Sequence, residues 1–195
     1  MAVPDPTSPS TIAGAPGHVR LVGDFLNTLE RQVAEESLET PAELHSWFVE
    51  RGLLGPEDHL TSRDLAVARS VREGLRNALL AHAGHQPDAA ATDSLNRALA
   101  AVDVRVELTS NGHPRLVPAA TSGPLQKALA AILEAMRQCT QDQTWERLKV
   151  CDRDSCRWAF YDTSRNRAGR WCSMAGCGNH IKMKRAYATR KANQA

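Results

Sequence analysis

The sequence of 195 residues is poor in aromatic side chains and contains no long apolar run. Aromatic residues make up only 5% of the chain, so its core must be mainly aliphatic, which the 42% hydrophobic content allows. No apolar stretch approaches the roughly 20 residues that a membrane-spanning helix needs. The first residues lack the positive and apolar regions of a secretory signal. We therefore expect a cytoplasmic protein that makes no contact with a membrane.

The usual patterns of catalytic side chains are also missing. The histidines are scattered, and none forms a Ser/His/Asp or metal-ligand pattern with its neighbours. Cys139 is the only cysteine outside a short C-terminal stretch, and it falls near the polar end of an expected helix. We expect no catalytic residues, and we interpret the protein as something other than an enzyme.

What the sequence does contain is a compact group of four cysteines. They form the pairs Cys151-x4-Cys156 and Cys172-x4-Cys177, with fifteen residues between the pairs. Two close pairs at this separation are typical of a tetrahedral thiolate site for one structural Zn²⁺. Two disulfides or free thiols are the alternatives, but nothing else in the chain suggests an oxidising compartment. A bound metal would also explain how a short polar segment folds, because it contributes about 10–16 kcal/mol in such modules.

Charge is distributed unevenly between the two parts of the chain. Residues 1–144 hold 12 Lys and Arg against 18 Asp and Glu, a balance of −6. Residues 145–195 hold 12 against 4, a balance of +8. This pattern indicates an acidic globular body with a basic C-terminal module, and such modules usually bind polyanions.

Hydrophobic spacing predicts a mainly helical body. A first helical stripe comprises Val22, Phe25, Leu26, Leu29 and Val33. Thr40-Pro41 is an N-cap followed by proline at the first helical position, and this second helix should end near Gly52. Thr61 or Ser62 caps a third helix. A loop over 83–92 precedes a short helix over 95–99, and Gly123-Pro124 begins the last helix of the body.

Between the last two helices the spacing changes to that of strands. Val102, Val104, Val106 and Leu108 alternate with polar residues, and Asn111-Gly112 then provides a hairpin turn. The predicted fold class is therefore α+β: a mainly helical N-terminal domain with one β-hairpin, followed by a small zinc module. We expect a disordered lead-in over 1–17, a body over 18–144 and the module over 145–195.

The zinc module resembles the CGNR zinc finger family. The resemblance rests on Cys151-x4-Cys156-x-Trp158, on Arg170-Trp171-Cys172 and on Cys177-Gly178-Asn179. Gly23-Asp24-Phe25-Leu26-Asn27-Thr28 is similar to the opening motif of the ABATE domain, which precedes this finger in bacterial proteins described as stress-responsive transcription regulators. The resemblance implies a DNA-binding regulator with a treble-clef-like finger (knuckle, hairpin, helix) and a sensor or dimerisation domain before it.

Two features of the finger depart from that family pattern. His180 stands where the motif ends in arginine, and the basic run before Trp171 holds only Arg167 and Arg170. We expect both changes to weaken contacts with nucleic acid and to leave the metal site intact. His180 follows Cys177 by three residues, but with four cysteines already at ligand spacing we interpret it as a bystander.

The basic residues of the module are the candidate nucleic-acid contacts. We expect them to neutralise phosphates. Asn179 and an arginine such as Arg165 on the hairpin have the hydrogen-bonding groups to read base edges, and the C-terminal helix is long enough to fit a major groove. The candidates are Arg157, Arg165, Arg167, Arg170, Asn179, Lys182, Lys184 and Arg185. Met183, Ala186 and Tyr187 share one helical face and are expected to pack inward. A solvated basic face, an RNA-binding finger and a protein-interaction finger are the alternatives.

One further side chain, a polar cluster of the first helix and an assembly complete the predictions. Asp162 is expected to bond the backbone and hold a turn, because a carboxylate would repel phosphate. Asp24, Asn27 and Thr28 are a candidate pocket for an unknown small-molecule effector, although structural roles for them are favoured. A homodimer is a further candidate assembly.

Overall fold

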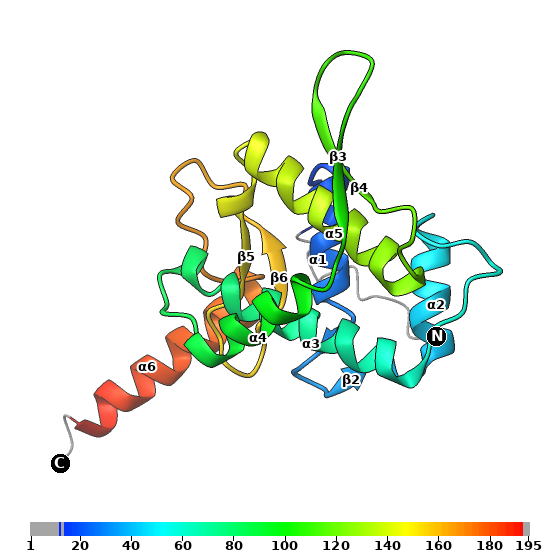
Figure 1. Cartoon of the computed structure of the whole chain (residues 1–195). Coiled ribbons are helices and arrows are strands. Elements are labelled where there is room, and N and C mark those ends of the chain that lie inside the picture. The colour runs from blue at the N-terminus through cyan, green and yellow to red at the C-terminus, as the bar shows by residue number, and fades with distance from the viewer. Residues whose placement is uncertain (1–11, 13, 193–195) are drawn as a thin grey trace.

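The structure, a computed structural model, describes residue 12 and residues 14–192, apart from the side chains of Arg185, Thr189 and Ala192. Its described part is mainly helical, with three small antiparallel strand pairs, which confirms the predicted α+β class (Figure 1). Within those ranges no helix has the length and apolar content that crossing a membrane requires.

Five α-helices make up most of the body, and side-chain caps fix where three of them begin. The helices are α1 (Gly17–Leu26), α2 (Pro41–Glu50), α3 (Ser62–Ala78), α4 (Ala89–Leu99) and α5 (Pro124–Gln141). Thr40 and Thr61 each form a capping box with the residue three positions on, and this confirms the predicted starts of α2 and α3. Asp88 caps α4 six residues earlier than predicted.

The first helix is shorter than its hydrophobic stripe predicts. It ends at Leu26, and Leu29 lies instead in strand β1 (Leu29–Glu30), which pairs with β2 (Glu35–Glu36). Ala34 adopts a positive φ of 56° in the connection between them, and Val33 is 65% exposed. The extension to Val33 was therefore wrong, because the chain turns into this small hairpin before the stripe is complete.

The predicted hairpin is confirmed as β3 (Val104–Leu108) and β4 (Pro114–Pro118). Gly112 takes the positive φ of 79° that the turn requires. Strand β4 packs along α5, while the hairpin tip extends away from the body (Figure 1).

The hydrophobic core lies around α1 and extends into the C-terminal module. Val19, Val22, Phe25 and Leu26 of α1 are fully buried against α3 and α5. Strands β5 (Leu148–Val150) and β6 (Ala159–Tyr161) contribute Leu148, Val150 and Ala159 to the same core. The boundary near residue 144 stays a prediction, but packing is continuous across it.

The expected disordered lead-in falls mostly outside the described residues. Of its described members, Ile12 and Ala15 are buried in the main core and α1 already begins at Gly17.

Candidate metal centre and nucleic-acid interface

The four cysteines of the C-terminal module come together as a metal site. Their Sγ atoms all lie within 4.8 Å of one another, with Cys156–Cys172 at 3.7 Å and Cys172–Cys177 at 3.8 Å. A tetrahedron of sulfur atoms about 2.3 Å from zinc has S–S edges of about 3.8 Å. The residues therefore fit one structural Zn²⁺, as the spacing predicted. His180 is exposed and is not part of the cluster.

Crowding of the sulfur atoms makes the site dependent on a cation. Contacts with Cys151 and Cys156 raise the pKa of the Cys172 thiol, while hydrogen bonds from Cys156 and Cys172 lower the pKa of Cys151. Four thiolates at these distances repel one another unless a positive ion lies between them. Zinc would supply that charge, and four sulfur ligands would leave it no open coordination position.

The local fold around the metal differs in one respect from the predicted order. Cys151 and Cys156 lie in the turn between β5 and β6, so the strands flank the first knuckle instead of following it. Of the second pair, Cys172 lies two residues before η3 (Met174–Gly178) and Cys177 lies within it. η3 is a single wide turn that leads directly into α6 (Asn179–Ala192). Trp158 and Trp171 pack against the cysteines, and both lie outside the strands.

A buried ion pair organises the loop between the two knuckles. Asp162 and Lys149 are 3% and 4% exposed, and the Nζ of Lys149 donates to Asp162 Oδ2 at 2.8 Å. Asp162 also accepts from the backbone N–H groups of Ser164 at 3.0 Å and Gly169 at 2.8 Å. Burial opposes its ionisation, but these hydrogen bonds prevail and lower the pKa of Asp162 to about 2. This confirms that Asp162 holds the loop.

Side chains of the body bind the module, mainly through hydrogen bonds to its backbone. The Asn27 amide donates to the Ala159 carbonyl at 3.0 Å and accepts from its N–H at 2.8 Å. Arg76, which is 3% exposed, donates to the Arg157 carbonyl at 2.7 Å. His85 contacts the carboxylate of Asp152 beside the first knuckle. Contacts from three side chains of the body thus fix the orientation of the metal site relative to it.

Most of the predicted nucleic-acid residues are exposed. Arg165, Arg167 and Arg170 lie on the 163–170 loop, and Asn179, Lys182 and Lys184 lie on α6. Arg157 is only half-exposed, because it contacts Asp154 and donates to the Cys151 carbonyl at 3.3 Å, within its own knuckle. Arg170 is exposed but donates to Asp152 Oδ2 at 2.5 Å. The side chain of Arg185 lies outside the described part. In Figure 1 the orange loop and the red α6 both lie on the left of the molecule.

The expectation that α6 buries an apolar face was wrong. Met183 is 74% exposed and Tyr187 is 70% exposed, and Ala186 is exposed as well. Helix α6 packs on η3 and then runs outward from the molecule (Figure 1). The spacing of three apolar residues was correct, but the fold provides no surface for them to cover.

Two of the three candidate effector residues at the end of α1 are engaged within the protein. Asn27 binds Ala159, and the Thr28 hydroxyl donates to the Phe25 carbonyl at 2.8 Å and accepts from Arg72 at 3.0 Å. Burial raises the pKa of the Asp24 carboxyl against the opposing charges of Arg51 and Arg20. Internal bonding of Asn27 and Thr28 is what the structural alternative requires.

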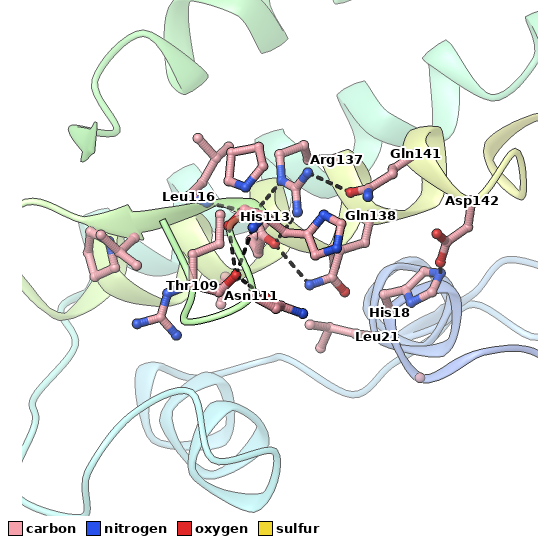
Figure 2. A pocket seen from close by; sticks show the side chains of 18 residues that line it. His18, Leu21, Thr109, Asn111, His113, Leu116, Arg137, Gln138, Gln141 and Asp142 are labelled. Carbon is pink, nitrogen blue, oxygen red and sulfur yellow. Dashed lines mark hydrogen bonds and ion pairs between the residues drawn. The ribbon is translucent and has the colours of Figure 1, made fainter. Parts of the chain in front are cut away.

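A groove lies elsewhere on the body, away from these three residues. This groove of about 710 Å³ runs between the start of α1, the β3–β4 hairpin and α5. Figure 2 shows His18 and Leu21 on one side of it, Asn111 and His113 on the hairpin, and Gln138 on α5. No sequence pattern indicates this groove, because its walls come from segments that meet only in the folded chain.

Reasoning from the sequence also missed Lys149 and Arg76. Both were counted as charge, yet both are buried and hold the module in place. For Lys149, its position between two apolar residues of a strand, Leu148 and Val150, was an available signal.

Comparison with known proteins gives two family matches along the chain. Residues 19–138 match the ABATE model, described as "Putative stress-induced transcription regulator". Residues 147–190 match the model of the CGNR zinc finger. No curated protein matches the chain.

Proposed function

The chain belongs to the ABATE family and carries a CGNR zinc finger, and from this premise we propose that it is a transcription regulator whose zinc module binds DNA. Neither matched family is an enzyme family. Burial raises the pKa of the Cys139 thiol to about 11, so this thiol stays protonated near neutral pH. We therefore propose no catalytic role.

The observation that carries the proposal is the exposed basic helix that follows the metal site. Helix α6 contains no acidic residue, and every side chain described from Lys182 to Lys191 is exposed. A helix of this kind fits the major groove, and its lysines can neutralise phosphates on either side. Zinc would fix the start of the helix, since Cys177 lies in η3, two residues before α6 begins at Asn179.

The 163–170 loop offers a second set of phosphate contacts. Arg165, Arg167 and Arg170 are exposed there, and the buried Lys149–Asp162 pair fixes the ends of the loop. A rigid loop loses little conformational entropy on binding. We propose that the loop and α6 contact the same duplex, which would make binding strongly dependent on salt concentration.

The alternative is a zinc-stabilised module that binds RNA or another protein. Its support is the exposure of Met183 and Tyr187, which lie one turn apart on α6. The charges around them favour nucleic acid over protein, and the length of the helix favours duplex DNA.

Selection from a random duplex DNA pool by the zinc-loaded full-length protein tests the proposal. The selection is made at two salt concentrations. We expect an enriched motif that persists at the higher salt concentration. Uniform binding that disappears with salt would mean phosphate contacts alone, and an absence of binding would favour the protein-interaction alternative.

We also propose that the groove between α1, the hairpin and α5 is where an effector binds. It combines apolar walls with hydrogen-bonding side chains, including His18, Asn111 and Gln138. Thermal-shift screening of metabolite classes, repeated on Gln138→Ala, tests this. A stabilising compound whose effect is lost in the variant would support the site, and an unchanged effect would exclude it.

A further inference from the structure

The β3–β4 hairpin has an apolar face whose β3 side is left exposed by the rest of the described chain. The strand register pairs Val104 with Pro118, Val106 with Leu116 and Leu108 with Pro114, so all these side chains share one face. On β3 the exposed fractions are 38% for Val104, 67% for Val106 and 74% for Leu108. Three exposed aliphatic residues in a row on one strand are unusual for a surface that faces only water.

The two outer edges of this hairpin are not equivalent. The outer edge of β4 is closed by α5, because the Glu134 carboxylate accepts from the Leu116 N–H at 2.7 Å. The outer edge of β3 pairs with no other strand in the described part of the chain. Exposed edges of this kind invite pairing with another strand.

The hydrogen-bond ladder identifies which backbone groups lie along that open edge. Asp103 and Thr109 bond to β4 at the two ends of the ladder, through Ala119 N to Asp103 O at 3.0 Å and Thr109 N to His113 O at 2.9 Å. Because inward and outward groups alternate in an antiparallel pair, the odd-numbered residues bond to β4. The N–H and C=O groups of Val104, Val106 and Leu108 therefore point outward.

We propose that a second copy of this chain pairs with the open edge of β3 as an antiparallel β3–β3 ladder with its two-fold axis at Val106. Each Val106 then faces its counterpart and exchanges both backbone hydrogen bonds with it. In this register Val104 lies opposite Leu108 of the second copy. The same surface serves both partners, as a two-fold dimer requires.

Charge complementarity selects this register. On the other face, Arg105 of each copy lies opposite Glu107 of the other, in the closer, non-hydrogen-bonded type of pair. Glu107 already lies 3.0 Å from Arg115 across the hairpin and 3.6 Å from Arg105. In the dimer each Glu107 would lie between its own Arg115 and the second copy's Arg105. One face of the four-stranded sheet would be apolar, and the other would carry alternating charges.

Sedimentation of the full-length, zinc-loaded protein without nucleic acid tests the dimer. We expect the wild type to dimerise and R105E and E107R each to self-associate about tenfold or more weakly, because each change places like charges opposite one another twice per dimer. An equal mixture of R105E and E107R restores both opposite-charge pairs, so we expect it to form heterodimers.

A matched control separates pairing between chains from damage to the hairpin. R115E places a like charge beside Glu107 within one chain and leaves the contacts between chains unaltered, so it should dimerise like the wild type. Thermal melts check that each variant is folded. A wild type that stays monomeric at about 100 μM would overturn the proposal. So would R105E and E107R variants that dimerise as strongly as the wild type, or an equal mixture of the two that forms no heterodimer. Because no DNA is present, these outcomes are independent of the proposed DNA binding.

Discussion

Asp162 shows how one side chain can set the geometry of a loop beside the metal centre. It is buried, and it binds Lys149 and the backbone N–H groups at both ends of the 163–170 loop. A buried carboxylate without these partners would be costly, so the pair and the loop conformation depend on each other. The exposed arginines of the loop take their positions from this arrangement.

Replacing Gly169 by alanine should disrupt that arrangement. A Cβ at this position would lie 2.7 Å from Cγ and Oδ1 of Asp162, which Lys149 prevents from moving away. We expect a loss of about 1–3 kcal/mol in unfolding free energy, as for overpacked sites. Gly176→Ala is the control, since its Cβ would meet Ser173 Oγ at an ordinary 3.7 Å. Denaturant unfolding of the zinc-loaded proteins measures the difference, and equal losses in both variants would contradict this account.

For individual residues, spacing in the sequence predicted the contacts that form between residues close together along the chain. The four cysteines could be assigned to one site because two short chelating loops constrain each other in the sequence. Lys149 and Asp162 lie thirteen residues apart and join only across a strand pair, so composition counted Lys149 as surface charge. Asn27 and Ala159 are 132 residues apart, and no sequence pattern connects them.

Among the elements, α5 stabilises the hairpin through a single carboxylate. Glu134 accepts from the Leu116 N–H of β4 and also binds Arg137 and Gln138. The Arg137 hydrogen bond is the largest influence, and with the others it lowers the pKa of Glu134 from 4.5 to about 2 against the effect of burial. Helix and hairpin are thereby fixed to each other along the groove.

Glu134→Gln should therefore destabilise the protein in a pH-dependent way. The pKa of Glu134 is lower in the folded state, so its stabilising effect is complete above pH 4.5 and is lost as pH falls towards 2. We expect the variant to melt at a lower temperature than the wild type at pH 7, with a gap that narrows below pH 4.5. Thermal melts over pH 3–7 measure the gap, and a gap that stays constant with pH would refute this role.

The end of α1 is a second point where one residue joins two elements. Asn27 makes two hydrogen bonds to the backbone of Ala159 in β6. Asn27→Ala leaves both backbone groups without these partners and should lower the free energy of unfolding by about 1–3 kcal/mol. Faster amide exchange at β6 with unchanged zinc binding is the expected result. Asn96→Ala, at an exposed position of α4, should change neither the amide exchange of β6 nor zinc binding. Amide exchange at β6 that stays at the wild-type rate in Asn27→Ala would contradict the prediction.

The sequence predicted elements well where their limits are set by adjacent residues. Thr40 and Thr61 define helix starts through bonds three residues away, and Asn111-Gly112 defines the hairpin turn. It failed at α1, where a chain reversal with Ala34 at positive φ interrupts the apolar stripe. It also failed at α6, because helical spacing says which residues share a face and not whether anything covers it.

For the whole molecule, the metal-dependent part is expected to be smaller than the C-terminal module. Strands β5 and β6 share the core of the body through Leu148, Val150 and Ala159, whereas the cysteines form a separate small cluster with Trp158 and Trp171. Chelation of zinc should therefore release the segments around the cysteines and α6 but leave β5 and β6 protected. Hydrogen exchange before and after chelation measures this, and loss of protection in β5 and β6 would show that zinc supports the whole module.

We propose above that the exposed basic helix behind the metal site binds DNA. Fluorescence anisotropy with a labelled duplex, over a series of salt concentrations, tests it most directly. The wild type is compared with a Lys182→Ala, Lys184→Ala double variant and with Lys127→Ala on α5 as control. We expect zinc-dependent binding whose salt slope falls by about two in the double variant and is unchanged in the control. Binding that is independent of zinc, or a double variant with the wild-type slope, would contradict it.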